Sequence, residues 1–129
     1  LLLCTGEFPE FKCEKLLVRP QRIIGSVTAA LASGLKLGVL VPDTDQVEQA
    51  LRRWSGVGAQ LHVEAASPYG AVRYIEGAAD NLKQWGAQLV VMDCMGYTLT
   101  MKSIVKQIVG VPVVLARSIL ARVVTELLA

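Results

Sequence analysis

Residues 35–41, LKLGVLV, form an almost unbroken apolar run that ends at Pro42. Such a run, without alternating polar residues, is typical of a strand covered on both faces of a parallel sheet. Asp43 follows as a candidate helix N-cap. Apolar residues then recur at the spacing of one helix face, at Val47, Ala50, Leu51 and Trp54. The stretch therefore predicts a strand followed by a helix, the repeating unit of an α/β fold.

The same unit recurs along the chain. Further apolar strands are expected at 60–65 (QLHVEA), 88–92 (QLVVM) and 112–116 (PVVLA). Helical patterns follow them, with Ser67 and Ser118 as candidate caps and with Gly86 and Gly110 as stops. Strands separated by helices pair in parallel through right-handed crossovers. We therefore expect a flavodoxin-like α/β lobe, a parallel sheet of order 2-1-3-4 with helices on both faces.

The segments outside this lobe suggest a longer protein. The opening residues LLLC look like the interior of a strand, here placed at 1–5, and a helix is expected at 20–33. We interpret 1–34 as the remnant of an N-terminal α/β lobe, 35–116 as the C-terminal lobe, and 117–129 as a helix packing on the first lobe. On this interpretation the chain is an oligomer or has a partner that supplies the missing lobe.

Composition excludes several classes of protein. Of the 129 residues, 53% are hydrophobic and 19% charged, which argues against a disordered chain. The net charge of +2 without a basic cluster predicts no nucleic-acid partner. No apolar run approaches the roughly 18 residues of a membrane span. Three cysteines, an odd number, and no recognisable secretion signal favour the reducing cytoplasm.

Candidate ligand-binding residues follow from the carboxyl ends of the strands, where parallel α/β sheets bind ligands. Two of these ends carry the same pattern, Cys4-Thr5-Gly6 and Cys94-Met95-Gly96. A thiol in such a position can remove or return a proton, and a nearby glycine lets a ligand approach the backbone. We expect Cys4 and Cys94 to be catalytic. The expected binding residues are Thr5, Gly6, Asp93, Met95, Gly96, Tyr97, Arg117 and Ser118.

Structural roles remain open for the same residues. A cysteine at the end of a strand is often a small buried apolar residue. Asp93 either caps its loop or orients a ligand or the thiol, and Arg117 either binds a carboxylate or lies exposed in a loop. A single histidine and scattered cysteines lack the spacing of a zinc site, so no metal is expected. No dinucleotide or phosphate-binding glycine loop is present, and we expect no cofactor.

The segments MDCMGY (92–97) and VPVVLARSILAR (111–122) closely resemble the C-terminal part of AroM family proteins. Upstream pieces fit the same family in the same order: LLLCTGEFPEF (1–11), LVRPQRIIGSV (17–27) and LGVLVP (37–42). AroM proteins are in turn similar to the aspartate/glutamate/hydantoin racemase superfamily, which has two α/β lobes that each contribute a strand-end cysteine. The resemblance implies that Cys4 and Cys94 form such a pair, acting on amino acids or related carbon acids without a cofactor.

Two functions remain open at this point. The first is a cofactor-independent racemase- or isomerase-like enzyme that acts on a small carboxylate or amino-acid-related substrate. The alternative is a non-catalytic small-molecule-binding or regulatory protein linked to aromatic amino-acid metabolism. Asp93 favours the alternative, because a carboxylate beside Cys94 disfavours the thiolate that a base requires.

Overall fold

The computed structural model describes all 129 residues and contains one parallel sheet of order β2-β1-β3-β4. Its strands are β1 (Lys36–Val41), β2 (Gln60–Ala65), β3 (Leu89–Met92) and β4 (Val113–Leu115). The predicted α/β class and the predicted strand order are both confirmed. The four predicted strands match those of the structure to within two residues at each end.

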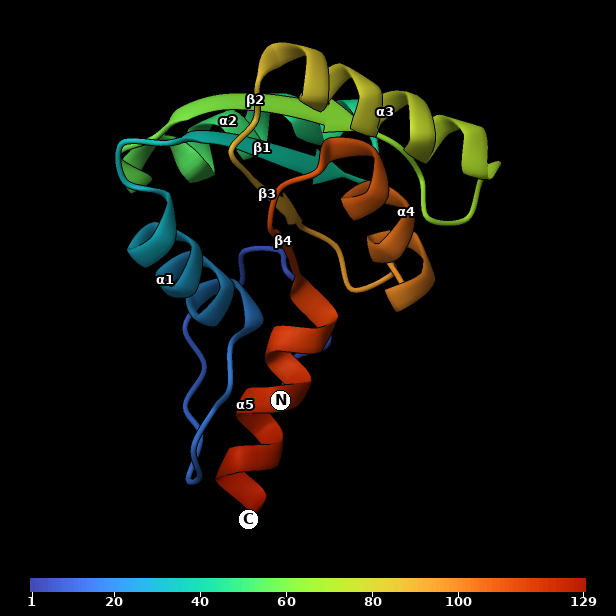
Figure 1. Ribbon diagram of the computed structural model, residues 1–129. Helices are drawn as coiled ribbons and strands as arrows, with labels where there is room; N and C mark the ends of the chain where they lie inside the picture. Colours follow the sequence, from blue (N-terminus) through green and yellow to red (C-terminus); the bar gives the residue numbers. More distant parts are fainter.

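Helices cover both faces of this sheet. They are α1 (Pro20–Ala32), α2 (Val47–Trp54), α3 (Val72–Trp85), α4 (Leu99–Val109) and α5 (Ala116–Leu128), with 3-10 turns η1 (Thr44–Gln46) and η2 (Ser55–Val57). Figure 1 shows α3 and α4 together along one side of the sheet, while α5 continues from β4, extends away from it and contacts α1. None of these helices combines the length and the apolar character that crossing a membrane requires.

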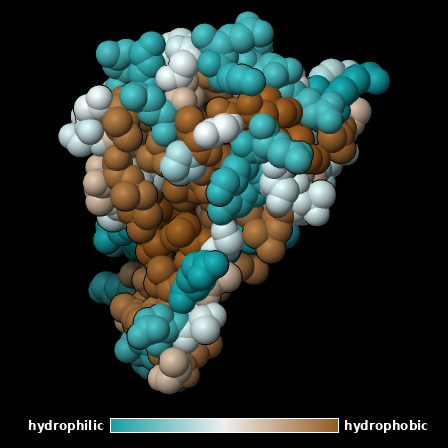
Figure 2. Space-filling model, viewed as in Figure 1, coloured by the Kyte–Doolittle hydropathy of each residue, from teal (hydrophilic) through white to brown (hydrophobic).

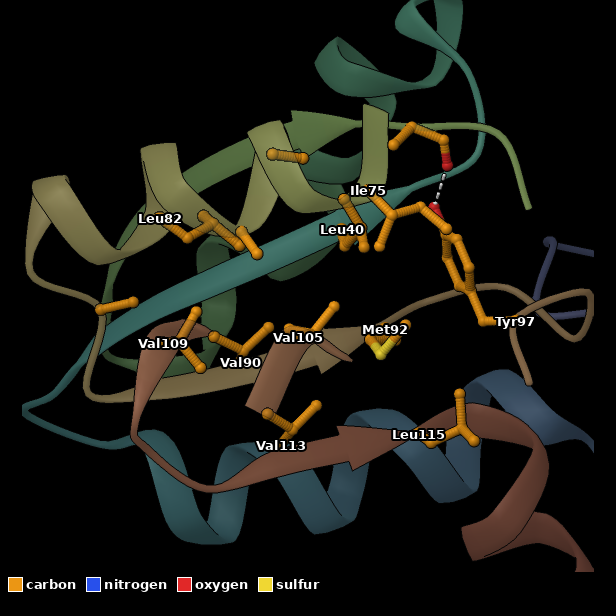
Figure 3. Close-up of a cluster of buried hydrophobic side chains, with 14 residues drawn as sticks. Leu40, Ile75, Leu82, Val90, Met92, Tyr97, Val105, Val109, Val113 and Leu115 are labelled. Atoms are coloured by element: carbon orange, nitrogen blue, oxygen red, sulfur yellow. Dashed lines mark hydrogen bonds between the residues drawn. The ribbon is translucent and has the colours of Figure 1, made fainter. Parts of the chain in front are cut away.

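The buried side chains of β1 divide between two cores. Leu40 packs with residues of α3 and α4, whereas Leu37, Val39 and Val41 pack with residues of α1 and α2. Figure 3 shows the first of these cores, where Leu82 of α3 and Val105 of α4 lie over the sheet. Both faces of β1 are thus covered, which explains why its sequence lacks polar alternation.

The register of the strands brings their carboxyl ends to one edge. Val41 of β1 pairs with Ala65 of β2, and Leu40 pairs with Met92 of β3, which in turn pairs with Leu115 of β4. The residues that follow each strand therefore lie close together. This edge is where polar groups from separate parts of the sequence can meet.

The N-terminal segment differs from the expectation. Residues 1–5 form no strand; the backbone of Leu2 makes one hydrogen bond to Val18, at 3.2 Å, and both Leu1 and Leu3 are exposed. Apolar residues become a strand only where a sheet edge pairs with them, and no edge reaches this segment. The assignment of 1–34 to a preceding lobe stays a prediction.

Two helices begin elsewhere than their candidate caps indicate. Ser67 accepts a hydrogen bond from the backbone of Tyr69 at 3.1 Å and forms a turn, and α3 begins only at Val72. Helix α5 begins at Ala116, directly after β4, so Ser118 lies within its first turn and donates to the Leu115 carbonyl at 3.1 Å. In both cases the serine oxygen has a local backbone partner that competes with capping.

An apolar face remains uncovered by the rest of the chain. Figure 2 shows apolar side chains gathered below the sheet, between α1 and α5. Large exposed apolar residues on these two helices include Leu31, Leu127 and Leu128. The low proportion of charged residues thus reflects an apolar surface as well as two cores.

Close packing of β1 against α3 gives a test of the fold. A Cβ atom at Gly38 would lie 2.9 Å from Leu82 Cδ2 and 3.3 Å from Ala87 Cβ. We expect Gly38→Val to lower the free energy of unfolding by about 1–3 kcal/mol through overpacking. A Cβ at Gly77, on the exposed side of α3, meets nothing within 4 Å. Gly77→Ala should raise the same quantity by up to about 1 kcal/mol. Urea titration measures both, and unchanged stability of Gly38→Val would contradict the packing.

Candidate functional site

A cavity of about 390 Å³ opens at the carboxyl edge of the sheet. Pro42, which follows β1, and Asp93, which follows β3, both line it. The chain runs from β1 to β2 on one side and reaches β3 on the other, so the gap between β1 and β3 is the topological switch point of the sheet. Ligands of open α/β sheets bind at such points.

Most of the predicted site residues meet at this cavity. It is lined by Cys4, Thr5, Gly6, Asp93, Cys94, Met95 and Gly96. Cys4 is exposed and Cys94 is half-buried, and neither forms a disulfide. The two Cys-x-Gly motifs, which are 90 residues apart in the sequence, therefore line the same cavity.

The two motifs have the same local geometry. The backbone N–H of Gly6 donates to Cys4 Sγ at 3.3 Å, and the backbone N–H of Gly96 donates to Cys94 Sγ, also at 3.3 Å. Each motif is therefore a turn that holds its own thiol, rather than a free pair of N–H groups open to a ligand.

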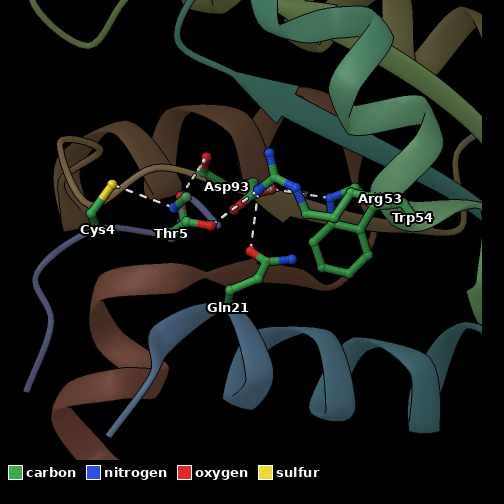
Figure 4. Close-up of polar contacts among 7 residues, drawn as sticks. Cys4, Thr5, Gln21, Arg53, Trp54 and Asp93 are labelled. Atoms are coloured by element: carbon green, nitrogen blue, oxygen red, sulfur yellow. Dashed lines mark hydrogen bonds and ion pairs between the residues drawn. The ribbon is translucent and has the colours of Figure 1, made fainter. Parts of the chain in front are cut away.

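Arg53 of α2 joins the two motifs. Its Nη1 donates to the Thr5 carbonyl at 3.1 Å and to Asp93 Oδ2 at 3.0 Å (Figure 4). The same nitrogen donates to Gln21 Oε1 of α1 at 3.1 Å. Thr5 adds a direct contact, because its hydroxyl donates to the Asp93 carbonyl at 3.4 Å. The N-terminal segment, α1, α2 and the loop after β3 are thus tied together at one point.

Asp93 is buried beneath the cavity. Its side chain is 0% exposed, and Oδ2 also accepts a hydrogen bond from Trp54 Nε1 at 3.0 Å, whereas Oδ1 has no partner. Burial raises the pKa of Asp93, while the charge of Arg53 and the Trp54 hydrogen bond partly offset this rise. The carboxyl group therefore binds its proton more tightly than an exposed aspartate does.

Cys94 is kept largely in its neutral form. Burial is the main cause that raises the pKa of Cys94; the Gly96 N–H opposes the rise, and Asp93 and Cys4 add to it. The raised pKa makes Cys94 a poor thiolate and a competent proton donor near neutral pH. The effect of Asp93 on this thiol agrees in direction with the expectation from the sequence.

Three predicted site residues lie away from the cavity lining. Tyr97 is buried and donates its hydroxyl to the Ala66 carbonyl at 2.6 Å, as part of the core under α3 and α4. Arg117 and Ser118 lie in the first turn of α5, in a separate groove with Arg122. Of the arginines only Arg53 lines the cavity, while Arg117 also lines a neighbouring apolar pocket with Leu3 and Met95. No group of three or more His, Cys, Asp or Glu side chains is placed to hold a metal ion.

The sequence did not indicate the contribution of α2. Gln46, Gln49 and Arg53 line the cavity, although the pattern of this helix predicts only a core face and a basic end. Trp54, an apparent core residue, also donates to Asp93. The spacing of Gln46, Gln49 and Arg53, at i, i+3 and i+7, was the available signal, since it places three long polar side chains on one face.

The fold and the cavity define an α/β protein whose candidate ligand site lies at the switch point of a parallel sheet. The sequence narrows this class to one family. Residues 1–128 match the family described as AroM protein, and the chain belongs to the AroM family. A comparison with curated proteins finds no match to the chain.

The burial of Asp93 gives a prediction for stability against pH. Because burial raises the pKa of Asp93 in the folded protein, the folded state keeps this proton to higher pH than the unfolded chain. Its stabilising effect is complete below the unfolded pKa, about 3.9, and is lost as pH rises through the folded value. Asp93→Asn removes this titration. The stability of the parent protein relative to the Asn variant should therefore fall with rising pH.

Urea titrations of both proteins between about pH 3.5 and pH 8 would measure this difference across the ordinary carboxyl range. Leaving Arg53 unpaired lowers the stability of the variant by the same amount at every pH in this range. It therefore does not change how the difference in stability varies with pH. A relative gain for the parent protein with rising pH would mean that pairing with Arg53 outweighs burial.

The state of Cys94 gives a second prediction. Because the thiolate is the reacting form, the rate of alkylation by iodoacetamide follows its fraction. The raised pKa of Cys94 should move its rate profile to higher pH than that of free cysteine. Asp93→Asn should shift the profile back toward lower pH, since it removes one cause of the rise. Mass spectrometry of the Cys94 peptide measures the rate. A profile at or below that of free cysteine would contradict the raised pKa.

Proposed function

We propose that this AroM family protein is a cofactor-independent racemase- or isomerase-like enzyme that acts on a small carboxylate or amino-acid-related substrate. Cys4 and Cys94 form its acid–base pair. The observation that carries this proposal is the repeated geometry of the two Cys-x-Gly turns, each with an N–H at 3.3 Å from sulfur, on one cavity.

The proton transfers balance without a redox step. One cysteine, as thiolate, takes the α-proton of the substrate into a new S–H bond, and the C–H electron pair stays on the substrate as an enolate. The other cysteine, as thiol, gives its proton to the opposite face of that carbon and becomes the thiolate. The configuration is inverted and the two cysteines have exchanged protonation states.

The different environments of the thiols suggest a direction for the first turnover. Cys4 is exposed whereas Cys94 is half-buried, so we assign Cys4 as the base. Cys94 has a raised pKa and is assigned as the acid. Arg53 lines the same cavity, where its positive charge would stabilise an enolate.

A second candidate function rests on the same raised pKa of Cys94 and on the buried Asp93. In the reverse direction Cys94 would have to act as the base, which a thiol that resists ionisation does poorly. The cavity would then only bind a small carboxylate. In that role the protein is a small-molecule-binding or regulatory protein linked to aromatic amino-acid metabolism. Binding without exchange of the ligand's α-proton would distinguish it from the enzyme.

Proton exchange tests the enzymatic proposal. The full chain in D₂O should catalyse exchange of the α-proton in at least one member of a panel of amino acids, hydantoins and shikimate-pathway acids, followed by NMR. Cys4→Ala and Cys94→Ala should each lower racemisation by about 10²–10⁴-fold, the usual contribution of a positioned acid or base. Each variant should still exchange the proton of one enantiomer, because one thiol remains on one face.

Cys13→Ala is the matched control, because Cys13 is exposed and does not line the cavity. Its exchange rates should equal those of the parent protein. Equal loss of exchange for both enantiomers in a single-cysteine variant would contradict the two-base scheme. Absence of any exchange across the panel, together with saturable binding of a panel member, would favour the second candidate function.

A further inference from the structure

A substrate carboxylate needs hydrogen-bond donors that the two cysteine turns do not supply. The N–H groups of Gly6 and Gly96 already point at sulfur. Arg117, the arginine that the sequence offered for this role, lies in a different groove. The other lining residues with side-chain donors are Tyr69, which is largely exposed, and the residues of α2 and its N-cap.

One face of this helix presents three donor side chains to the cavity. Gln46, Gln49 and Arg53 follow one another at i, i+3 and i+7 and all line the cavity. The residues that directly follow Gln49 and Arg53, which are Ala50 and Trp54, are buried in the core under α1 and α2. Packing of this adjacent apolar face thus fixes the orientation of the polar face.

These side chains have N–H groups that make no hydrogen bond within the protein. All three hydrogen bonds of Arg53 come from Nη1, and Nη2 has no partner. Figure 4 shows the second terminal nitrogen on the side of the guanidinium group away from Gln21. Arg53 Nε also has no partner, and it is buried, since the side chain is only 8% exposed. The side chains of Gln46 and Gln49 make no hydrogen bond within the protein.

The charges around the cavity favour an anion there. Arg53 and Asp93 are the only charged residues that line it. Asp93 Oδ2 is already paired with Nη1 of Arg53 and accepts the Trp54 hydrogen bond. Arg53 thus lines the cavity with Nη2 unpaired, and no second carboxylate lies there to offset its charge. A planar fork of this kind matches the two oxygens of a carboxylate.

We propose that Gln46, Gln49 and Arg53 form a carboxylate-binding subsite, which holds the substrate's carboxylate while its α-carbon lies between the thiols. On this proposal the substrate is a monocarboxylate or an amino acid bound through its α-carboxylate. The position of the α-carbon rests on the proposed function, but the binding of the carboxylate does not.

Haloacetates test the subsite without knowledge of the substrate. Iodoacetate carries a carboxylate to a thiol, and iodoacetamide is its neutral counterpart of nearly the same shape. The ratio of their alkylation rates at Cys4 should be high in the parent protein, because the subsite draws in the anion. Mass spectrometry of the Cys4 and Cys13 peptides gives both ratios in one reaction, with Cys13 as the internal reference.

Substitutions on the two faces of α2 separate a local subsite from a general charge effect. Gln49→Glu should lower the ratio at Cys4 by about tenfold, equivalent to about 1.4 kcal/mol. Arg52→Gln is the matched control, because it changes the net charge by the same unit on the exposed face, where Arg52 pairs with Glu48. The ratio at Cys4 should stay unchanged in this control, and the ratio at Cys13 should stay unchanged in both.

Arg53→Lys and Gln46→Ala extend the test. Both should lower the Cys4 ratio, and Gln46→Ala leaves the Arg53 hydrogen bonds intact, so a folding defect of the arginine variant does not decide the outcome. Equal effects of Gln49→Glu and Arg52→Gln, or no effect of either Gln variant, would overturn the subsite. A persistent iodoacetate preference with no α-proton exchange would retain the subsite and reject the racemase chemistry.

Discussion

The buried pair of Arg53 and Asp93 is the interaction on which the site depends. Removing an arginine and an aspartate from water is costly, and a pair at 3.0 Å recovers that cost only when other hydrogen bonds satisfy both groups. Trp54, Thr5 and Gln21 provide part of these further contacts, while Asp93 Oδ1 and Arg53 Nε remain without a partner. Loss of either charged partner would leave the other buried and unpaired, which is more damaging than loss of an exposed ion pair.

The parallel sheet explains why this pair lies where it does. Each strand delivers its last residue to the same edge, and the order β2-β1-β3-β4 leaves a gap between the loops after β1 and β3. The strands are short and apolar, so the first polar group after β3, Asp93, is also the first that needs a partner. Helix α2, which follows β1, supplies that partner from the other side of the gap.

Much of the fold could be predicted from the sequence, because apolar runs such as 35–41 specify buried strands and the periodicity of the helices specifies their core faces. The same reasoning placed Cys94 just after β3, because the end of a strand can be recognised from the local sequence. It failed for residues 1–5, because apolar character does not reveal whether a neighbouring strand is within reach. It missed Arg53 because a basic residue at a helix end is usually solvated, and only the tertiary structure brings Asp93 to it.

The N-terminal segment is held far more weakly than the sheet that it serves. Leu2 makes one backbone hydrogen bond to Val18, and Thr5 contributes the contacts with Arg53 and Asp93. Segments with few buried contacts detach by local unfolding at a free energy well below that of the whole domain. Cys4 can therefore leave the cavity while both cores stay intact. The folded protein is thus expected to exchange between a state in which Cys4 lies beside Cys94 and one in which it does not. A contact that holds the first few residues against Arg53 would increase the population of the first state.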